Sequence, residues 1–141
     1  MAEGILKKVL TNSAGNQVLV VASAGIDALE DFTPDRNTVA VCAKRNVHIA
    51  SHKARQLTKA ILKDTDIVLC MEKMHKQRIL SAFPKFAKHV FLLKEYMQQD
   101  APHHASIEDP TGKSKTDYEA CFKEIDQEIH RIAPLLLKEK I

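Results

Sequence analysis

Short apolar runs that alternate with amphipathic helical segments are the feature that most restricts how this chain can fold. Runs rich in β-branched and large aliphatic residues predict strands at residues 18–22, 66–71 and 89–93. Segments with apolar residues at helical spacing predict helices at residues 2–10, 35–45, 58–62, 72–83 and 114–137. This alternation predicts an α/β fold with a parallel sheet between two layers of helices, a three-layer α/β/α arrangement.

Turn and capping residues set the expected helix boundaries. Thr58 is placed to cap the short helix that follows it, and Pro84 cannot continue the helix that precedes it. A turn at residues 109–112 opens the last helix, whose apolar stripe repeats at intervals of three and four residues: Tyr118, Phe122, Ile125, Ile129 and Ile132. We therefore expect the last helix to pack along its length against the core.

Composition limits the classes of protein to which the chain can belong. Its 141 residues suit one domain over residues 1–141, and a composition of 45% apolar and 28% charged residues is that of an ordinary globule. The formal charge of +3 is small and lysines are interspersed with acids, so no nucleic-acid partner is indicated. No apolar run approaches the roughly 20 residues of a membrane span, and no basic-then-apolar leader begins the chain. We expect no membrane partner and a cytoplasmic location.

The cysteines and histidines do not indicate a metal site. Cys42, Cys70 and Cys121 are odd in number and widely spaced in apolar surroundings, which fits neither a disulfide framework nor zinc binding. We predict buried free thiols. Adjacent side chains such as His103 and His104 do not easily face one ion, so a solvated loop is the simpler interpretation. No metal and no other cofactor is expected.

The start of the chain is irregular for such a fold. In a parallel α/β sheet each helix returns from a strand, yet the first predicted helix begins at Met1 with no strand and no capping residue before it. We therefore expect the domain to be incomplete at its N-terminus.

Six segments, taken together and in order, resemble the low-molecular-weight protein-tyrosine-phosphatase family. They are residues 1–6 (MAEGIL), 21–25 (VASAG), 51–57 (SHKARQL), 66–71 (DIVLCM), 93–96 (LKEY) and 107–110 (IEDP). The LKEY segment and the turn at Gly112 are most similar to the bacterial branch, which includes protein-arginine phosphatases. The resemblance implies a phosphotyrosine protein phosphatase I-like fold and a hydrolase that acts on phosphotyrosine or phosphoarginine in proteins.

The resemblance also implies a central first strand that ends in a loop of Cys, five residues and Arg, and this chain contains no such loop. The residues six positions after the three cysteines are His48, Lys76 and Gln127. We expect the chain as given to be inactive, since both the nucleophile and the Arg that clamps phosphate are missing. Two alternatives stay open: a pseudo-phosphatase binding module, and an unrelated doubly wound domain that binds a phosphate or nucleotide.

The resemblance assigns roles to four residues. Asp109, before Pro110, becomes the general acid; Ser23 and His52 support the phosphate loop; and Thr111 takes a substrate-binding position that is aromatic in tyrosine-specific relatives. Without the resemblance, Asp109 reads as a turn residue, Ser23 as a local cap and His52 as a satisfied polar side chain.

Partners follow from the same resemblance. The ligand is expected to be a phosphorylated protein or a small phosphoester once the loop is restored. The absent strand would lie between residues 18–22 and 67–71, which leaves unpaired backbone on both sides. We therefore expect the chain to shift a strand, to self-associate through exposed strand edges, or to be poorly stable.

Overall fold

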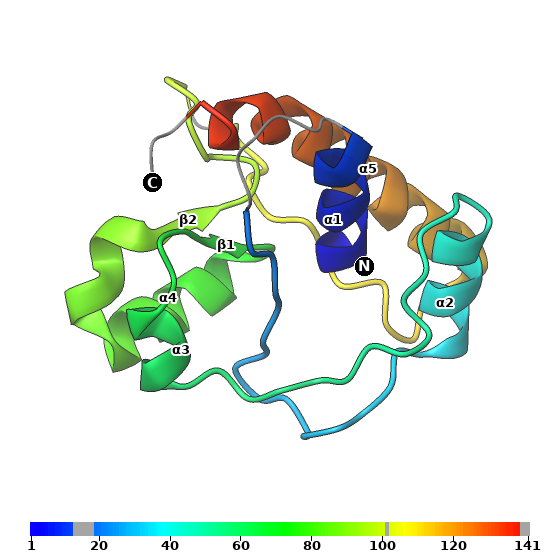
Figure 1. The fold of residues 1–141 in the computed structure, drawn as a ribbon, viewed down its shortest axis with the longest axis horizontal. Helices are drawn as coiled ribbons and strands as arrows, with labels where there is room; N and C mark the ends of the chain where they lie inside the picture. Colours follow the sequence, from blue (N-terminus) through cyan, green and yellow to red (C-terminus); the bar gives the residue numbers. More distant parts are fainter. Residues whose placement is uncertain (13–18, 101, 139–141) are drawn as a thin grey trace.

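The structure, a computed structural model, describes residues 1–12, 19–100 and 102–138 (Figure 1). Its helices are α1 (Ala2–Asn12), α2 (Arg36–Ala43), α3 (Lys59–Lys63), α4 (Lys73–Ala82) and α5 (Lys115–Leu136). The described residues also form a 3-10 helix, η1 (Pro84–His89), and the strands β1 (Val68–Cys70) and β2 (Val90–Leu92). All five predicted helices are present, and the second and third predicted strands are present in shorter form.

The two strands pair in parallel and separate two buried clusters. Leu69 pairs with Phe91, and both side chains pack against the cluster that contains α1, α2 and α5. The next pair, Cys70 and Leu92, belongs to the cluster on the other side, with Leu62 of α3 and Ile79 of α4. Because successive side chains of a strand face opposite sides of a sheet, helices cover both faces. The predicted α/β fold with a parallel sheet is confirmed.

Helix α5 forms the main support of the larger cluster. The predicted apolar stripe is buried throughout: Tyr118, Phe122, Ile125, Ile129 and Ile132. Figure 1 shows α5 running along one side of the molecule, with α1 and α2 packed against it. Gly4 lets α1 approach the next layer, because a Cβ there would lie 2.6 Å from Ile49 Cγ2. The first turn of α1 therefore packs closely against the segment that follows α2, within the same buried cluster as α5.

Capping residues and proline set helix boundaries close to the predicted ones. The Asp35 side chain accepts hydrogen bonds from the backbone N–H groups of Asn37 and Thr38, and Thr58 Oγ1 accepts one from the N–H of Ile61. Pro84 ends α4 as predicted, but it also begins η1, which the apolar pattern had not indicated. Proline suits a first helical position because its missing N–H would have no partner there.

The prediction of a strand at residues 18–22 is wrong for residues 19–22, and Val18 lies outside the described residues. Residues 19–22 form no ladder with another described segment, and Val20 is 94% exposed. A strand requires a neighbour that accepts and donates backbone hydrogen bonds, and β1 has its only described ladder partner in β2. An apolar β-branched run alone does not supply that neighbour.

Candidate functional site

Ser23 and His52 meet at one carboxylate in the first turn of α1. Ser23 Oγ donates a hydrogen bond to Glu3 Oε2 at 2.6 Å, and His52 Nδ1 lies 3.7 Å from the same oxygen. Arg55 Nε donates to the carbonyl oxygen of Ser23 at 2.8 Å, which fixes the backbone beside the serine. The structure therefore brings together two predicted site residues that are distant in sequence. We call Glu3, Ser23 and His52 the Glu3 cluster.

Glu3 is held as a carboxylate. Burial, which leaves its side chain only 16% exposed, opposes ionisation. Hydrogen bonds from Lys7 and Ser23, together with the charges of Lys7 and His52, outweigh burial and lower the pKa of Glu3 below its usual value. The first turn of a helix also favours negative charge. The Glu3 carboxylate is thus a charged acceptor that orients the Ser23 hydroxyl and lies near the His52 imidazole.

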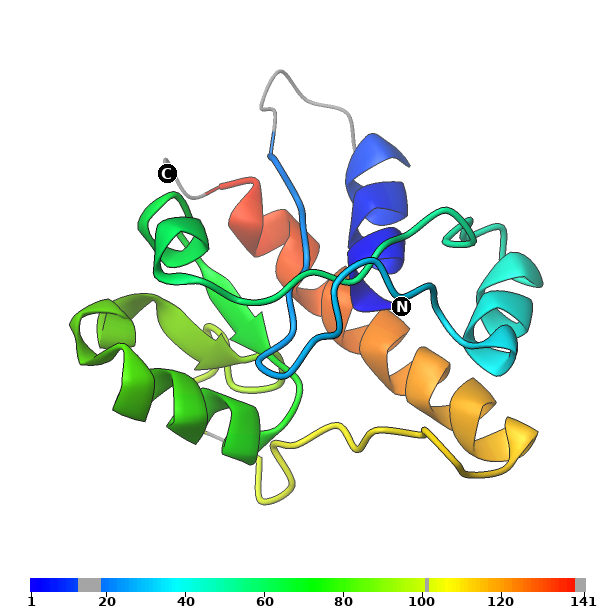
Figure 2. The ribbon, with the colours of Figure 1, turned by 90° about the horizontal axis from the view of Figure 1, so that it is seen from below.

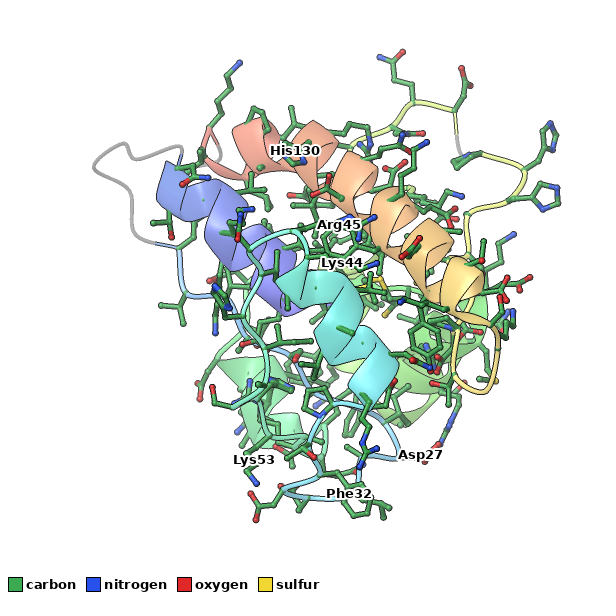
Figure 3. The ribbon with its side chains drawn as sticks, turned by 90° about the vertical axis from the view of Figure 1, so that its right-hand side faces the viewer. Asp27, Phe32, Lys44, Arg45, Lys53 and His130 are labelled. Carbon is green, nitrogen blue, oxygen red and sulfur yellow. The ribbon has the colours of Figure 1, made fainter. Side chains whose placement is uncertain are left out.

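Backbone pairing between two loop segments places Ser23 beside His52. Gly25 N–H donates to the carbonyl of Arg55 at 3.0 Å, and Leu57 N–H donates to the carbonyl of Gly25 at 2.8 Å, so Gly25 and Gln56 form a parallel bridge. The two terminal nitrogens of the Arg78 guanidinium, on α4, donate hydrogen bonds to the two carboxylate oxygens of Asp27, at 2.5 and 2.7 Å. Figure 3 shows Asp27, Phe32 and Lys53 at the same end of the molecule, where these segments lie together.

Asp109 and Thr111 lie in one turn just before α5. Asp109 Oδ1 accepts a hydrogen bond from Thr111 N–H at 2.9 Å, and Lys113 N–H donates to the carbonyl of Pro110 at 2.9 Å. Gly112 has a φ of +79°, a conformation that side-chain-bearing residues rarely adopt. Upstream, buried Ile107 donates its N–H to the carbonyl of Met71 at 2.8 Å. The exposed Asp109 carboxylate is therefore held near the carboxyl end of β1.

The Asp109 turn and the Glu3 cluster share one buried core but no direct contact. Ile5 of α1 and Ile107 belong to the same apolar cluster. Among the described residues, no hydrogen bond or ion pair joins Asp109 or Thr111 to Glu3, Ser23 or His52. The shared apolar core connects the two groups, and the Asp109 carboxylate is exposed while the Glu3 carboxylate is mostly buried.

The three cysteines are buried free thiols, as predicted. Burial raises the pKa of Cys70 and of Cys121 to about 11, and it raises the pKa of Cys42 as well. A thiol of this kind is almost entirely protonated near neutral pH. None of the three is suited to act as a nucleophile.

A large groove between α1 and α5 holds none of the predicted site residues. It has a volume of about 740 Å³, and Ile5, Val47 and Phe122 are among the residues that line it. Arg45, labelled in Figure 3, lies over the Phe122 ring at 4.7 Å, and His130 Nδ1 lies 3.5 Å from Asp126 Oδ1. Lys8, Arg45 and Glu119 of the groove also have partners nearby, and the mixed charges of its lining indicate no particular chemistry.

Glu3 is the site residue that sequence reasoning missed. Helical spacing alone places Glu3 on the polar face of the first predicted helix, opposite Ile5. An acidic residue in a first helical turn was the available signal, but only the fold brings Ser23 and His52 to it. The described residues include no cluster of three or more potential metal ligands and no helix long and apolar enough to cross a bilayer.

Comparison with known proteins gives consistent matches over the whole chain. The family model described as low molecular weight phosphotyrosine protein phosphatase matches residues 1–141. A probable low molecular weight protein-tyrosine-phosphatase, EpsP of Ralstonia nicotianae, is 32% identical over 134 residues, which are 95% of this chain and 84% of that protein. The protein-arginine-phosphatase of Bacillus subtilis is 29% identical over 140 residues, covering 99% of this chain and 89% of that protein.

A solved structure agrees with these sequence matches. The crystal structure of a YwlE mutant from Bacillus subtilis superposes with a TM-score of 0.87 at 27% identity, over 97% of this chain and 88% of that chain. The parallel sheet and its helical layers are thus those of a known phosphatase fold.

Proposed function

Because the chain belongs to the low molecular weight phosphotyrosine protein phosphatase family, we propose that residues 1–141 form one domain, the body of a phosphatase acting on phosphorylated protein. The observation that carries the proposal is the Asp109 turn, in which an exposed carboxylate is bound to the N–H of Thr111 beside the end of β1. A carboxyl group fixed by its backbone but open to solvent is suited to proton transfer with a ligand.

In the proposed reaction Asp109 is the general acid. A thiolate attacks phosphorus, the bond from phosphorus to the leaving atom breaks, and Asp109 gives that atom its proton. In a second step water displaces the cysteine, and Asp109, now a carboxylate, accepts the proton of that water. A general acid must be accessible to the substrate, and Asp109 is exposed to solvent.

The Glu3 cluster supports the phosphate loop in this proposal. The hydrogen bond to Glu3 orients Ser23 before a loop is bound, and His52 lies beside the same carboxylate. A loop that closes over the first turn of α1 finds its hydrogen-bond partners already placed, which lowers the entropic cost of ordering it. Glu3 thus acts as a positioning residue for Ser23 and His52.

Two substrate classes fit the family, and Thr111 is the proposed substrate contact that bears on the choice. EpsP is named as a tyrosine phosphatase, whereas the Bacillus subtilis relative is named as an arginine phosphatase. Thr111 is exposed next to the Asp109 turn and offers no aromatic ring on which a phenol could stack. The proposed substrate is therefore phosphotyrosine or phosphoarginine in a protein, with Thr111 reducing the advantage of phosphotyrosine.

The 141 residues alone are proposed to be inactive. They contain no Cys followed six positions later by Arg, and their cysteines are buried. We propose that a strand and a Cys-x5-Arg loop complete the site beside β1. The family match over residues 1–141 does not favour an unrelated nucleotide-binding domain, and a pseudo-phosphatase is distinguished from an enzyme by the test below.

The test compares the 141-residue chain with the same chain preceded by the strand and Cys-x5-Arg loop of the Bacillus subtilis relative. With p-nitrophenyl phosphate, we expect the first protein to match a buffer blank and the second to release phosphate. Replacing the grafted Cys with Ser should abolish the release. Phosphate release by the 141-residue chain that disappears in Asp109→Ala would overturn the assignment of inactivity, and binding of phosphopeptide without hydrolysis by the grafted protein would favour a binding module.

A further inference from the structure

The turn that holds Asp109 also contains an ion pair. Glu108 precedes Asp109 directly, Lys113 follows it by four positions, and Lys113 Nζ donates a hydrogen bond to Glu108 Oε2 at 2.8 Å. Figure 2 shows the segment before α5 approaching the first turn of that helix, and the pair lies in this segment. Both side chains are exposed. One positive and one negative charge therefore flank the carboxylate proposed as the general acid.

The two members of the pair stabilise each other in the ionised form. The hydrogen bond and the charge of Lys113 lower the pKa of Glu108, and those of Glu108 raise the pKa of Lys113. The charges of Asp117 and Asp109 also raise the pKa of Lys113, so its ammonium group is within electrostatic reach of Asp109. Among the described residues, however, Lys113 forms an ion pair with Glu108 alone. Glu108 thus engages a cation that would otherwise be available to Asp109.

Asp109 has one engaged carboxylate oxygen and one without a donor. Its Oδ1 accepts the N–H of Thr111, and no described residue donates a hydrogen bond to Oδ2. An ammonium group paired with this carboxylate would favour its ionised form. A general acid must carry its proton when the substrate binds, so an ion pair between Asp109 and Lys113 would oppose catalysis.

Other elements also bring charged or titratable groups to the groove of about 410 Å³ beside this turn. Glu124 pairs with Lys94 at 2.7 Å, and Asp117 accepts hydrogen bonds from Ser114 in the capping box of α5. The remaining groups of this kind in the groove are Lys73, His103, His104 and Cys121. These groups are the same in every variant compared below, so differences between variants report on Glu108 and Lys113.

We propose that Glu108 is a positioning residue for proton transfer: by engaging Lys113, it keeps this cation from stabilising the Asp109 carboxylate, so that Asp109 retains the proton it gives to the leaving group. The inference rests on the proposed phosphatase function for the role of Asp109. Loss of Glu108 leaves Lys113 uncompensated and favours the ionised form of Asp109. Loss of Lys113 leaves Glu108 uncompensated and favours the protonated form. The two substitutions should therefore act in opposite directions and offset each other when combined.

The first test follows Asp109 in the 141-residue chain, without any reaction. The variants are Glu108→Gln, Lys113→Gln and the two combined, and NMR of side-chain carboxyl carbons measures protonation of Asp109 as the pH is varied. The matched control is Glu119→Gln, which removes the carboxylate that pairs with Lys44 at 3.1 Å outside this turn. Amide spectra establish that each variant is folded.

We expect the midpoint of the Asp109 titration to move to lower pH in Glu108→Gln and to higher pH in Lys113→Gln. The combined variant and the control should lie near the parent. Movement in the same direction for both single variants, or no movement in either, would overturn the proposal.

The second test measures the pH dependence of kcat/KM in the loop-grafted protein with phenyl phosphate, whose poor leaving group depends on the general acid. Above the pH at which Asp109 loses its proton, we expect Glu108→Gln to lower kcat/KM by about 1.5-fold to fivefold, the range for one exposed ion pair. Lys113→Gln should raise it. The loss in Glu108→Gln should be smaller at low pH, where Asp109 is protonated in every variant. A loss that is equal at all pH values would show that Glu108 acts only on structure, and would overturn the proposal.

The two measurements separate this inference from the proposed function. If the loop-grafted parent does not hydrolyse phenyl phosphate, the phosphatase assignment fails, while the NMR titration still decides whether the ion pair controls protonation of Asp109. If the parent is active and Glu108→Gln has the same pH profile, the positioning role of Glu108 fails alone.

Discussion

At the residue scale, two carboxylates of the candidate site have opposite surroundings: Glu3 in the first turn of α1 and Asp109 in the turn before α5. Glu3 is mostly buried and engaged by Lys7, Ser23 and His52, so its charge organises neighbouring side chains. Asp109 is exposed, and among the described residues its side chain is hydrogen-bonded only within its own turn, to the N–H of Thr111. A carboxylate engaged by several donors is suited to positioning, and one that is free on its outer side is suited to chemistry.

Replacing Asp109 with Asn in the loop-grafted protein tests the second of these roles. The amide keeps the turn, since its oxygen can accept the hydrogen bond of Thr111, but it cannot donate a proton in the same way. We expect turnover to fall about 10²–10⁴-fold on substrates with poor leaving groups and much less on p-nitrophenyl phosphate, whose leaving oxygen needs little protonation. Steady-state kinetics on both substrates measure the difference, and equal losses would refute the assignment.

Replacing Glu3 with Gln tests the first role through its pH dependence. The pKa of Glu3 is lowered in the folded chain, so its stabilisation is fully present above the ordinary value of 4.5 and is lost as pH falls through the folded value. We expect Glu3→Gln to cost about 1–2 kcal/mol at pH 7, discounted for partial exposure, and less at pH 3.

Urea unfolding at the two pH values measures this effect, with Asp100→Asn, at an exposed position, as the control. The cost of Glu3→Gln should shrink on acidification, while the control should lie near the parent at both pH values. A cost that does not change with pH would show that the charge of Glu3 is not what stabilises the cluster.

At the element scale, capping determines where the helices begin, and the cap of α2 is also tied to α5. Asp35 accepts from the backbone N–H groups of Asn37 and Thr38, and the buried Tyr118 hydroxyl donates to the same carboxylate. Burial opposes ionisation of Asp35, but these hydrogen bonds outweigh it and lower its pKa. A residue that local sequence explains as a cap therefore also joins two helices.

Substitution of Asp35 should separate the two contributions. Asp35→Ala removes the cap, worth about 0.5–2 kcal/mol, and leaves the buried Tyr118 hydroxyl without this acceptor, for a total of about 1–3 kcal/mol. Asp35→Asn keeps an acceptor for both and should cost less than half as much. Thermal or urea denaturation measures the losses, with Asp100→Ala as the control, and equal losses for the Ala and Asn variants would contradict this account.

At the scale of the whole molecule, the sheet has open edges. β1 pairs with β2 alone among the described strands, and residues 19–22 make no hydrogen bond to another described residue. Val20, in this unpaired segment, is 94% exposed. Unpaired backbone beside exposed apolar side chains recruits further strands from other molecules.

We therefore expect the 141-residue chain to associate with itself as its concentration rises. Val20→Lys should weaken the association by about tenfold or more, because it removes an exposed valine whose burial between chains would be worth roughly 1.5–3 kcal/mol and adds repulsion between chains. Sedimentation velocity over a range of concentrations measures the effect, with Lys85→Gln as a surface control. A parent chain that stays monomeric throughout would contradict the expectation.

The sequence by itself determined the elements whose signals are local. Helical periodicity identified α1 to α5, Thr58 marked a helix start, and Pro84 marked a helix end. The α/β fold followed from the same alternation, and the buried thiols followed from their apolar surroundings. These features depend on residues within a few positions of one another, where backbone and side-chain preferences act directly.

Only the tertiary structure decided which residues face one another and which backbone finds a partner. Residues 19–22 have strand-like composition but no neighbouring ladder, so they are not a strand. Glu3 looked like an ordinary surface acid until the fold brought Ser23 and His52 to it. Pairing of strands and clustering of charges depend on groups far apart in the chain, whose meeting is fixed by packing of the whole molecule and not by local preference.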